Sequence, residues 1–209
     1  MTLYVPTAFR VEDRRALVDF IERHAFGTLV STGPAGFDVS HVPFLLDEGE
    51  DGRLTLLTHF ARANPQAQNL ASAAHVLAIF QGPHAYVSPT WYENHPAVPT
   101  WNYAVVHAHG RARPLEEPAL RSVLARLSAQ YESHRERPWR MEALADDYVA
   151  KMVNAIAGFA IEVERLEGKF KLSQNRPAGD AARVADALES EGAADLAALM
   201  RDRNPAARR

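Results

Sequence analysis

Cysteine is absent from this chain of 209 residues. The chain therefore forms no disulfide and offers neither a thiolate metal ligand nor a thiol nucleophile. Long apolar runs are missing as well: no stretch approaches the length that spans a bilayer, and the N-terminus lacks a charged start followed by an apolar core. We therefore expect a cytoplasmic protein with no membrane partner.

A strong charge of one sign is also missing. The 23 basic and 26 acidic residues give a formal net charge of -3, so the whole chain has no general attraction for DNA or for an anionic membrane. The motifs G-x-S-x-G, G-x-x-x-x-G-K-S/T and G-x-G-x-x-G do not occur, which removes the usual support for hydrolase, kinase and dinucleotide-binding functions. What is present is enough apolar material for a sizeable core, since 47% of the residues are hydrophobic.

The apolar pattern predicts an antiparallel β protein with a few helices. A helix is expected over residues 12–24, and turn residues such as Gly33-Pro34 separate the β-rich runs that follow. The expected strands cover residues 26–32, 37–46, 53–60, 76–81, 103–113, 158–165 and 169–174, the last two joined by a turn at Glu167-Gly168. Six or seven strands with peripheral helices indicate a β-barrel of the α+β class.

Helices are expected again in the second half of the chain. Residues 114–118 open one helix, and residues 144–156 form another. Residues 179–201 predict a helical tail broken near Gly192, and residues 204–209 are expected to fray. Since no repeat or low-complexity linker divides the chain, we expect one domain over residues 1–176 and a helical C-terminal tail over residues 177–209.

The segment LLTHFARANPQAQNL, residues 56–70, predicts an anion site. A strand ends with Thr58 and His59, Arg62 follows, and Asn64 precedes a proline, which is a preferred start for a helix. Free backbone N–H groups and the positive end of the helix dipole then lie beside these side chains, a set of donors that suits a phosphate. The alternative is that Asn64 only caps a helix and that Arg62 is a solvated charge.

The expected strand over residues 103–113 has two different faces. One is small and apolar, and the other carries His107, His109, Arg111 and Arg113. With His84 or His41, its two histidines would make a three-histidine metal site, but no acidic or fourth ligand has suitable spacing, so we predict no metal. We expect this face to line a dimer seam or to pack under a cofactor; a plain solvated strand face is the alternative.

Seven segments together resemble a known family. In order they are YVPTAFR, FGTLVST, SHVPFLL, LTHFARANPQ, VLAIFQGPHAYVSPTWY, VPTWNYAVVHAHG and KLSQNR, and they span residues 3–176. The chain resembles the PaiB-like FMN-binding negative transcriptional regulators, above all in GPHAYVSPTWY, VPTWNY and KLSQNR. The resemblance implies a split β-barrel, related to pyridoxamine-phosphate oxidase-like flavoproteins, that forms a homodimer with FMN at the subunit seam.

The resemblance also implies an FMN site, residue by residue. It places Thr58, His59, Arg62 and Asn64 where such barrels hold the flavin phosphate, the place that the helix-capping argument reached independently. His41 would lie near the isoalloxazine or the ribityl chain, and Trp101 and Asn102 would contact the cofactor from a loop or from the partner subunit. The remaining predicted contacts are Lys171, Gln174 and Asn175. The Arg-Lys pair usual in pyridoxamine-phosphate oxidases is here Arg62-Ala63.

Two functions are compatible with these residues. The first is repression of transcription with the flavin as cofactor or sensor, although no recognition helix of the helix-turn-helix type stands out for a DNA partner. The second is a flavin-dependent reductase or oxidase of a small molecule, in which FMN performs hydride or electron transfer. Haem binding by a histidine is a third, fainter possibility. The aromatic residues of GPHAYVSPTWY suit either a wall for the flavin or a dimer contact.

Overall fold

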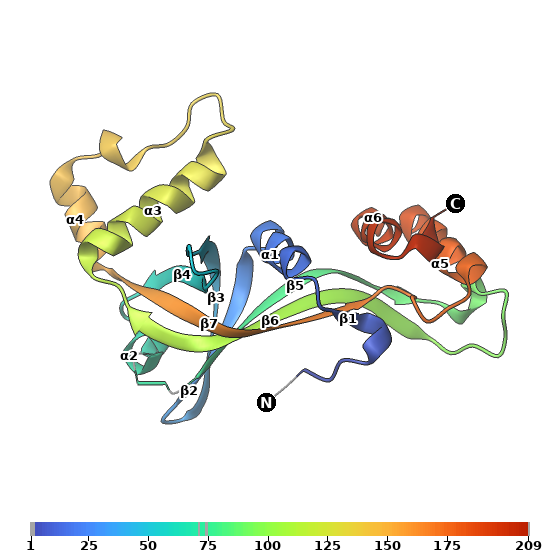
Figure 1. Cartoon of the computed structure of the whole chain (residues 1–209). Helices are drawn as coiled ribbons and strands as arrows, with labels where there is room; N and C mark the ends of the chain where they lie inside the picture. The colour runs from blue at the N-terminus through green and yellow to red at the C-terminus, as the bar shows by residue number, and fades with distance from the viewer. Residues whose placement is uncertain (1–2, 71, 74, 209) are drawn as a thin grey trace. The chain divides into compact units, whose positions relative to one another are not determined.

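The structure is a computed structural model that describes residues 3–70, 72–73 and 75–208 (Figure 1). The strands are β1 (Arg10–Val11), β2 (Phe26–Gly33), β3 (Gly36–Glu48), β4 (Leu54–Ala61), β5 (Val76–Val87), β6 (Thr100–Pro114) and β7 (Ile156–Lys171). The helices are α1 (Arg14–Arg23), α2 (Pro65–Leu70), α3 (Glu117–Glu132), α4 (Asp146–Asn154), α5 (Ala178–Ser190) and α6 (Ala194–Arg203). Within these ranges, no helix is long and apolar enough to cross a membrane.

The seven strands form one sheet in the order β1-β7-β4-β3-β2-β5-β6, and β7 also pairs with β6. The pairs β2–β3, β2–β5, β3–β4 and β4–β7 are antiparallel. Because β6 pairs with β7, the strand order returns to its start, as it does in a barrel. The predicted α+β class, with six to seven antiparallel strands and peripheral helices, is confirmed.

The chain divides into two compact units. Unit 1 consists of the described parts of Met1–Phe20, Gln81–His107 and Glu167–Arg209, and unit 2 consists of the described parts of Ile21–Phe80 and Ala108–Leu166. Strands β5, β6 and β7 contribute residues to both units. Helices α5 and α6 belong to unit 1, together with the GPHAYVSPTWY and KLSQNR segments. The domain boundary expected at residue 176 stays a prediction.

Unit 2 is built on the β2–β3 hairpin. Gly33 pairs with Gly36, whose φ of 123° is in the region that favours glycine, so the predicted turn at Gly33-Pro34 is confirmed. Alternate side chains of the strands point inward, and the rings of Phe44 and Phe80 meet edge to face with their centroids 5.2 Å apart. Helix α3 covers the other side of β3 and β4 through a buried cluster of Leu45, Leu57, Val123, Leu127 and Ala160.

Unit 1 has a core of its own. Helices α5 and α6 bury Val184, Leu188, Leu196 and Met200 almost completely. The fully buried carboxylate of Asp180 accepts hydrogen bonds from the backbone N of Glu93 at 2.8 Å and from Nδ2 of Asn94 at 3.1 Å. The loop that follows GPHAYVSPTWY is therefore fastened to the first turn of α5.

The turn predicted at Glu167-Gly168 is wrong, because β7 is one continuous strand. Its first half pairs with β4, and its second half pairs with β1, where Gly168 lies opposite Val11. A Cβ atom at Gly168 would lie 2.3 Å from Cδ2 of Leu17. The glycine therefore permits the close packing of α1 on the strand and does not reverse the chain. Strand β5 also continues to Val87, beyond the predicted end at residue 81, and β6 begins at Thr100, before the predicted start at residue 103.

The C-terminal prediction is right about the helix break and wrong about the end. Gly192, with φ 87°, separates α5 from α6 as expected. Fraying of residues 204–208 does not occur, because Nδ2 of the buried Asn204 donates to the carbonyl of Leu172 at 3.0 Å and Ala207 is buried. Arg209 lies outside the described residues.

Candidate functional site

The ten predicted FMN contacts divide equally between the two units. Unit 2 holds His41 on β3, Thr58 and His59 on β4, and Arg62 and Asn64 between β4 and α2. Unit 1 holds Trp101 and Asn102 on β6, Lys171 at the end of β7, and Gln174 and Asn175 just after it. Within each unit the residues lie on neighbouring strands or on one short segment.

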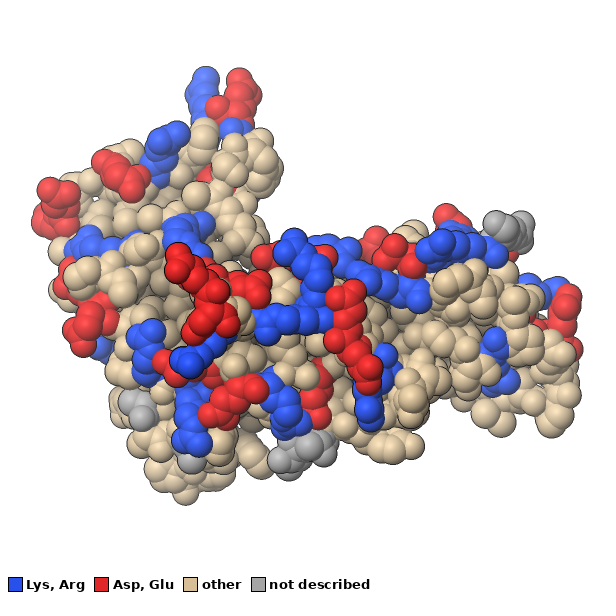
Figure 2. Space-filling view, in the orientation of Figure 1, with Lys and Arg blue, Asp and Glu red and all other residues tan. Residues whose placement is uncertain are grey.

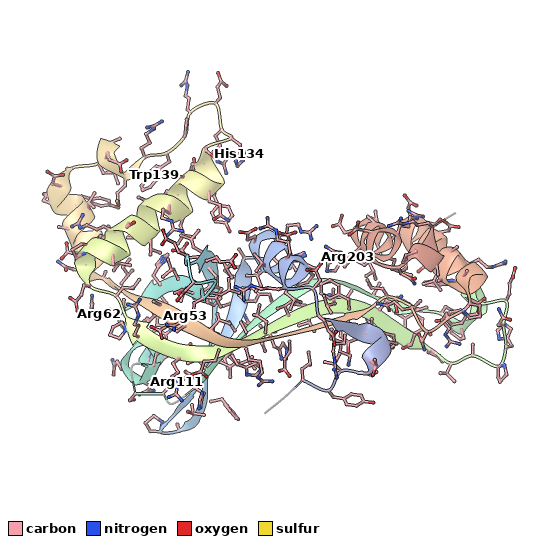
Figure 3. The ribbon with its side chains drawn as sticks, viewed as in Figure 1. Arg53, Arg62, Arg111, His134, Trp139 and Arg203 are labelled. Carbon is pink, nitrogen blue, oxygen red and sulfur yellow. The ribbon has the colours of Figure 1, made fainter. Side chains whose placement is uncertain are left out.

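Arg62 is tied to the backbone of the neighbouring elements (Figure 3). Its Nε donates to the carbonyl of Asn154 at 2.8 Å, and its Nη2 donates to the carbonyl of Ile156 at 2.7 Å. Its backbone N–H donates to the carbonyl of Ala155 at 2.9 Å. Because a guanidinium has five N–H donors, three remain for a ligand. Arg62 is thus held in place at the point where α4 ends and β7 begins.

Asn64 caps α2, as the sequence predicts. Its Oδ1 accepts from the backbone N of Gln66 at 2.9 Å, and its Nδ2 donates to Oγ of Ser40 at 2.9 Å. The buried Gln66 then donates from Nε2 to Oγ of Ser31 at 2.9 Å and to the carbonyl of Asp38 at 3.1 Å. These bonds hold the short helix on the β2–β3 hairpin. Gln66 was not predicted from the sequence, where its only signal is an uncharged polar residue on a short helix.

Thr58 and His41 have partners inside unit 2. Thr58 is fully buried, and its Oγ1 donates to the carbonyl of Pro43 at 2.8 Å, which links β4 to β3. Nδ1 of the exposed His41 lies 2.9 Å from Oγ1 of Thr28, its cross-strand neighbour on β2. Their predicted contacts with FMN stay predictions.

His59 is different, because it has an unsatisfied atom. Its ring is half-buried, and no described residue is a hydrogen-bond partner for its buried Nδ1. Burial lowers the pKa of His59 below its ordinary value of 6.5, so the ring is neutral at pH 7. A neutral imidazole has one donor and one acceptor nitrogen, and a buried polar atom without a partner is costly. A ligand that reached this nitrogen would remove that cost.

In unit 1, Asn102 and Trp101 point to opposite faces of β6. Asn102 is 1% exposed and donates from Nδ2 to Oγ of Ser173 at 2.9 Å, and its buried Oδ1 has no partner among the described residues. Trp101 is 53% exposed, and its ring centroid lies 6.1 Å from that of Tyr86 and 6.4 Å from that of His84. A ring surface therefore stays open on this strand face.

The KLSQNR segment makes a tight, internally bonded turn. Oε1 of Gln174 accepts from the backbone N of Leu172 at 2.7 Å, and its Nε2 donates to the carbonyl of Phe170 at 2.6 Å. Ser173, at the centre, has φ 65°, and Asn175 is exposed. Nζ of the half-buried Lys171 donates to Oγ1 of Thr100. Gln174 thus shapes the turn, and the predicted FMN contacts of these residues stay predictions.

The cationic face of β6 meets an acidic face of β7. Nε of Arg111 lies 2.8 Å from Oε1 of Glu164, and Nε of Arg113 lies 3.3 Å from Oε1 of Glu162. Both pairs are exposed, so they contribute little to stability but cancel the local charge. Figure 2 likewise shows basic and acidic side chains interspersed on the face in view. Among the described residues, no group of three or more His, Asp or Glu side chains is arranged to hold a metal.

Comparison with known proteins identifies the family. The chain matches the family model described as "Putative FMN-binding domain" over residues 3–165. The chain belongs to this family. The FMN-binding domain also confirms the predicted cofactor, FMN.

A curated relative and two solved structures are similar to this chain. Protease synthase and sporulation protein PAI 2 of Bacillus subtilis (strain 168) is 35% identical over 204 residues, which cover 96% of this chain and 98% of the relative. The FAD and heme binding protein from Mycobacterium smegmatis aligns with a TM-score of 0.56 and 16% identity, covering 78% of this chain and 73% of the other. The conserved hypothetical protein Rv2991 from Mycobacterium tuberculosis aligns with a TM-score of 0.58 and 19% identity, covering 84% of this chain and 94% of the other. At these identities the two structures bear on the fold alone, and the predicted split barrel is confirmed.

FMN suits the polar atoms that the chain leaves unsatisfied. Nδ1 of His59 and Oδ1 of Asn102, each in a predicted FMN contact, are among the few buried side-chain atoms without a partner in the described parts of the chain. FMN carries phosphate oxygens, ribityl hydroxyls and ring N–H and carbonyl groups, so it offers partners to both kinds of atom. The donors of Arg62 and the unpartnered Nδ1 of His59 therefore suit the chemistry of this cofactor, and the contacts themselves stay predictions.

Proposed function

We propose that the chain is a homodimeric FMN-binding protein that represses transcription, with the flavin as cofactor or sensor. The observation that carries the proposal is the 35% identity over 96% of the chain to PAI 2, a relative whose name refers to protease synthase and sporulation. The resemblance of the sequence to negative regulators supports the same role. DNA is the partner that this role requires.

The segment between β4 and α2 is the proposed place for the FMN phosphate. Arg62 keeps three N–H donors, its position is set by two carbonyls, and the neutral His59 adds a nitrogen without an internal partner. Hydrogen bonds from the side-chain amide of Gln66 hold the same segment in place. This reduces the entropy that the segment loses when a ligand binds. When bound, FMN supplies hydride or electron transfer or a redox-sensitive group. The chain's own residues bind and orient it.

An exposed aromatic surface in unit 1 supports the proposed dimer. Trp101 and Tyr86 are 53% and 45% exposed, and their ring centroids lie 6.1 Å apart. Large apolar side chains gathered on one surface are typical of a contact with another molecule. A second copy of this chain, with FMN at the seam, would cover them.

The first experiment tests FMN binding and the dimer. The purified protein is expected to show a flavin absorption spectrum, to bind FMN more tightly than riboflavin, and to sediment as a dimer. Equal affinity for FMN and riboflavin would show that no phosphate site exists. A haem spectrum in place of a flavin spectrum would show that the protein binds haem and not FMN.

The second experiment separates repression from catalysis. Mobility-shift titrations against genomic promoter fragments at moderate salt are expected to give a specific band that changes with FMN occupancy. The salt concentration matters because phosphate contacts weaken steeply as it rises. If no specific band forms, and anaerobic mixing with reduced nicotinamide cofactors bleaches the flavin, the protein is a flavin-dependent reductase and not a repressor.

A further inference from the structure

Three half-buried cations gather at the end of β7. They are Lys169, Lys171 and Arg176, and the two lysines are two of the three in the whole chain. In the part of the chain that the structure describes, none of the three forms an ion pair with a carboxylate. Other cations of this chain are paired, as Arg126 is with Asp47. Positive charges that gather without a paired carboxylate create a local potential that attracts anions.

The three charges act on one another. Burial lowers the pKa of Lys171, and the charges of Lys169 and then Arg176 lower it further. The other two cations make cation–π contacts. Nζ of Lys169 lies 5.4 Å from the ring centroid of Tyr103, and Cζ of Arg176 lies 4.3 Å from that of Tyr92. An anion at this place would be attracted by all three groups and would relieve their repulsion.

Two carboxylates of unit 1, those of Asp180 and Glu93, are already engaged. Asp180 feels the charge of Arg176, but one of its oxygens accepts from the backbone of Glu93 and the other from Nδ2 of Asn94. The side chain of Glu93 is paired with Arg183. These two carboxylates therefore do not pair with the cations of the cluster.

The backbone that carries the cluster is held from inside. Ser173 has φ 65° and is buried, and Asn102 donates to its hydroxyl at 2.9 Å. Gln174 bonds to the backbone on both sides of Lys171, and Asn204 of the C-terminal tail donates to the carbonyl of Leu172. A non-glycine residue with positive φ costs energy and persists where its surroundings impose it. These bonds thus hold the turn from which Arg176 lies close enough for its charge to act on Lys171.

We propose that Lys169, Lys171 and Arg176, with the hydroxyl of Thr100, bind a phosphate monoester group. A monoester is a dianion at neutral pH with three acceptor oxygens, which suits two ammonium groups and one guanidinium better than a single carboxylate does. The group belongs either to a second phosphorylated ligand or to FMN. The second case rests on the proposed FMN binding but moves the FMN phosphate from the β4–α2 segment to this cluster, because FMN carries a single phosphate.

The experiment uses glycerol 3-phosphate as a simple monoester, together with FMN and riboflavin. Binding of glycerol 3-phosphate to the FMN-saturated protein is measured by titration calorimetry, and the FMN and riboflavin affinities of the apoprotein are measured by fluorescence. Lys171→Gln is the test variant, and Lys151→Gln, an exposed lysine on α4, is the matched control. Lys169→Gln and Arg176→Gln repeat the test if the first variant does not fold.

The two sources give different results. With a second ligand, the FMN-saturated protein binds glycerol 3-phosphate, and Lys171→Gln weakens this binding at least tenfold. With FMN as the source, glycerol 3-phosphate competes with FMN, and Lys171→Gln weakens FMN at least tenfold while riboflavin changes less than twofold. The proposal is overturned if every affinity of the folded variants stays within twofold of the Lys151→Gln control. Failure of FMN to bind the unmutated protein would count against the proposed function and leaves the glycerol 3-phosphate titration as the test of the cluster.

Discussion

Arg62 and Asn154 are joined by a hydrogen bond of 2.8 Å between Nε of the arginine and the carbonyl oxygen at the last residue of α4. A helix C-terminus has unpaired carbonyls and carries a partial negative charge, so a guanidinium there is well placed. The residue that the sequence identifies as a phosphate ligand therefore also fastens the β4–α2 segment to the rest of unit 2. Its substitution should affect both stability and FMN binding.

Replacement of Arg62 by alanine is expected to lower the free energy of unfolding of the apoprotein by about 1 to 3 kcal/mol, because two carbonyls lose a charged donor. It is also expected to weaken FMN binding by about 1.5 to 3 kcal/mol. Urea unfolding and FMN titration measure the two effects. Arg53→Ala, which removes an 88% exposed side chain, is the control and should change neither. Unchanged stability of Arg62→Ala would contradict the role of these bonds.

His59 is expected to make stability depend on pH below about 6.5. Because burial lowers its pKa in the folded state, the unfolded chain binds the proton more readily. Its contribution is complete above 6.5 and is lost as the pH falls through the pKa of the folded state. His59→Gln should flatten this part of the stability curve, measured by urea unfolding between pH 5 and 8. His134→Gln, an exposed histidine, should leave the curve as it is; the same flattening in both variants would rule out His59 as the cause.

Gly110→Ala is expected to disrupt the pairing of β6 with β7. A Cβ atom there would lie 2.1 Å from the carbonyl oxygen of Glu162, a backbone atom that cannot turn aside. Overpacking of this kind costs about 1 to 3 kcal/mol or more. Gly179→Ala is the control, since its nearest neighbour is Oε2 of Glu93 at 3.9 Å and alanine favours the helix. Thermal unfolding should separate the two variants, and equal midpoints would mean that the strands are not this close.

Asn204→Ala is expected to destabilise the protein by about 1 to 3 kcal/mol, because the buried carbonyl of Leu172 loses its partner. The exposed Asn175→Ala is the control for stability. Limited proteolysis adds a second readout: cleavage after the arginines of α6 should speed up in Asn204→Ala alone. Rapid cleavage there in the unmutated protein would instead restore the prediction of a frayed end.

The sequence could predict the features that neighbouring residues decide. Alternation of apolar side chains located β2, β3 and β4, and the Gly33-Pro34 signal located their first turn. Asn64 before Pro65 predicted the start of α2, and Gly192 predicted the break before α6. Each of these features depends on side chains within a few residues, so the local pattern was sufficient.

The candidate site needed tertiary information. The cap at Asn64 could be read from the sequence, but the bonds of Gln66 to Ser31 and Asp38 join residues that meet only after the hairpin forms. The family motifs pointed to Lys171, yet its relation to Arg176 depends on the turn at Ser173. The residues adjacent to a lysine in the sequence do not show whether it has a counter-ion in the folded protein.

By itself, the sequence determined an antiparallel α+β protein of this FMN-binding family, since period-two alternation, turn residues and family motifs are all local properties. The tertiary structure alone decided that Gly168 is a packing glycine, that Arg111 faces Glu164, and that Asn204 closes the C-terminal end. The physical reason is that these partners lie far apart in the chain and meet only through the order and register of the strands. The sequence around a residue is the same whether a closely packed side chain, a counter-ion or water lies beside it in the folded protein.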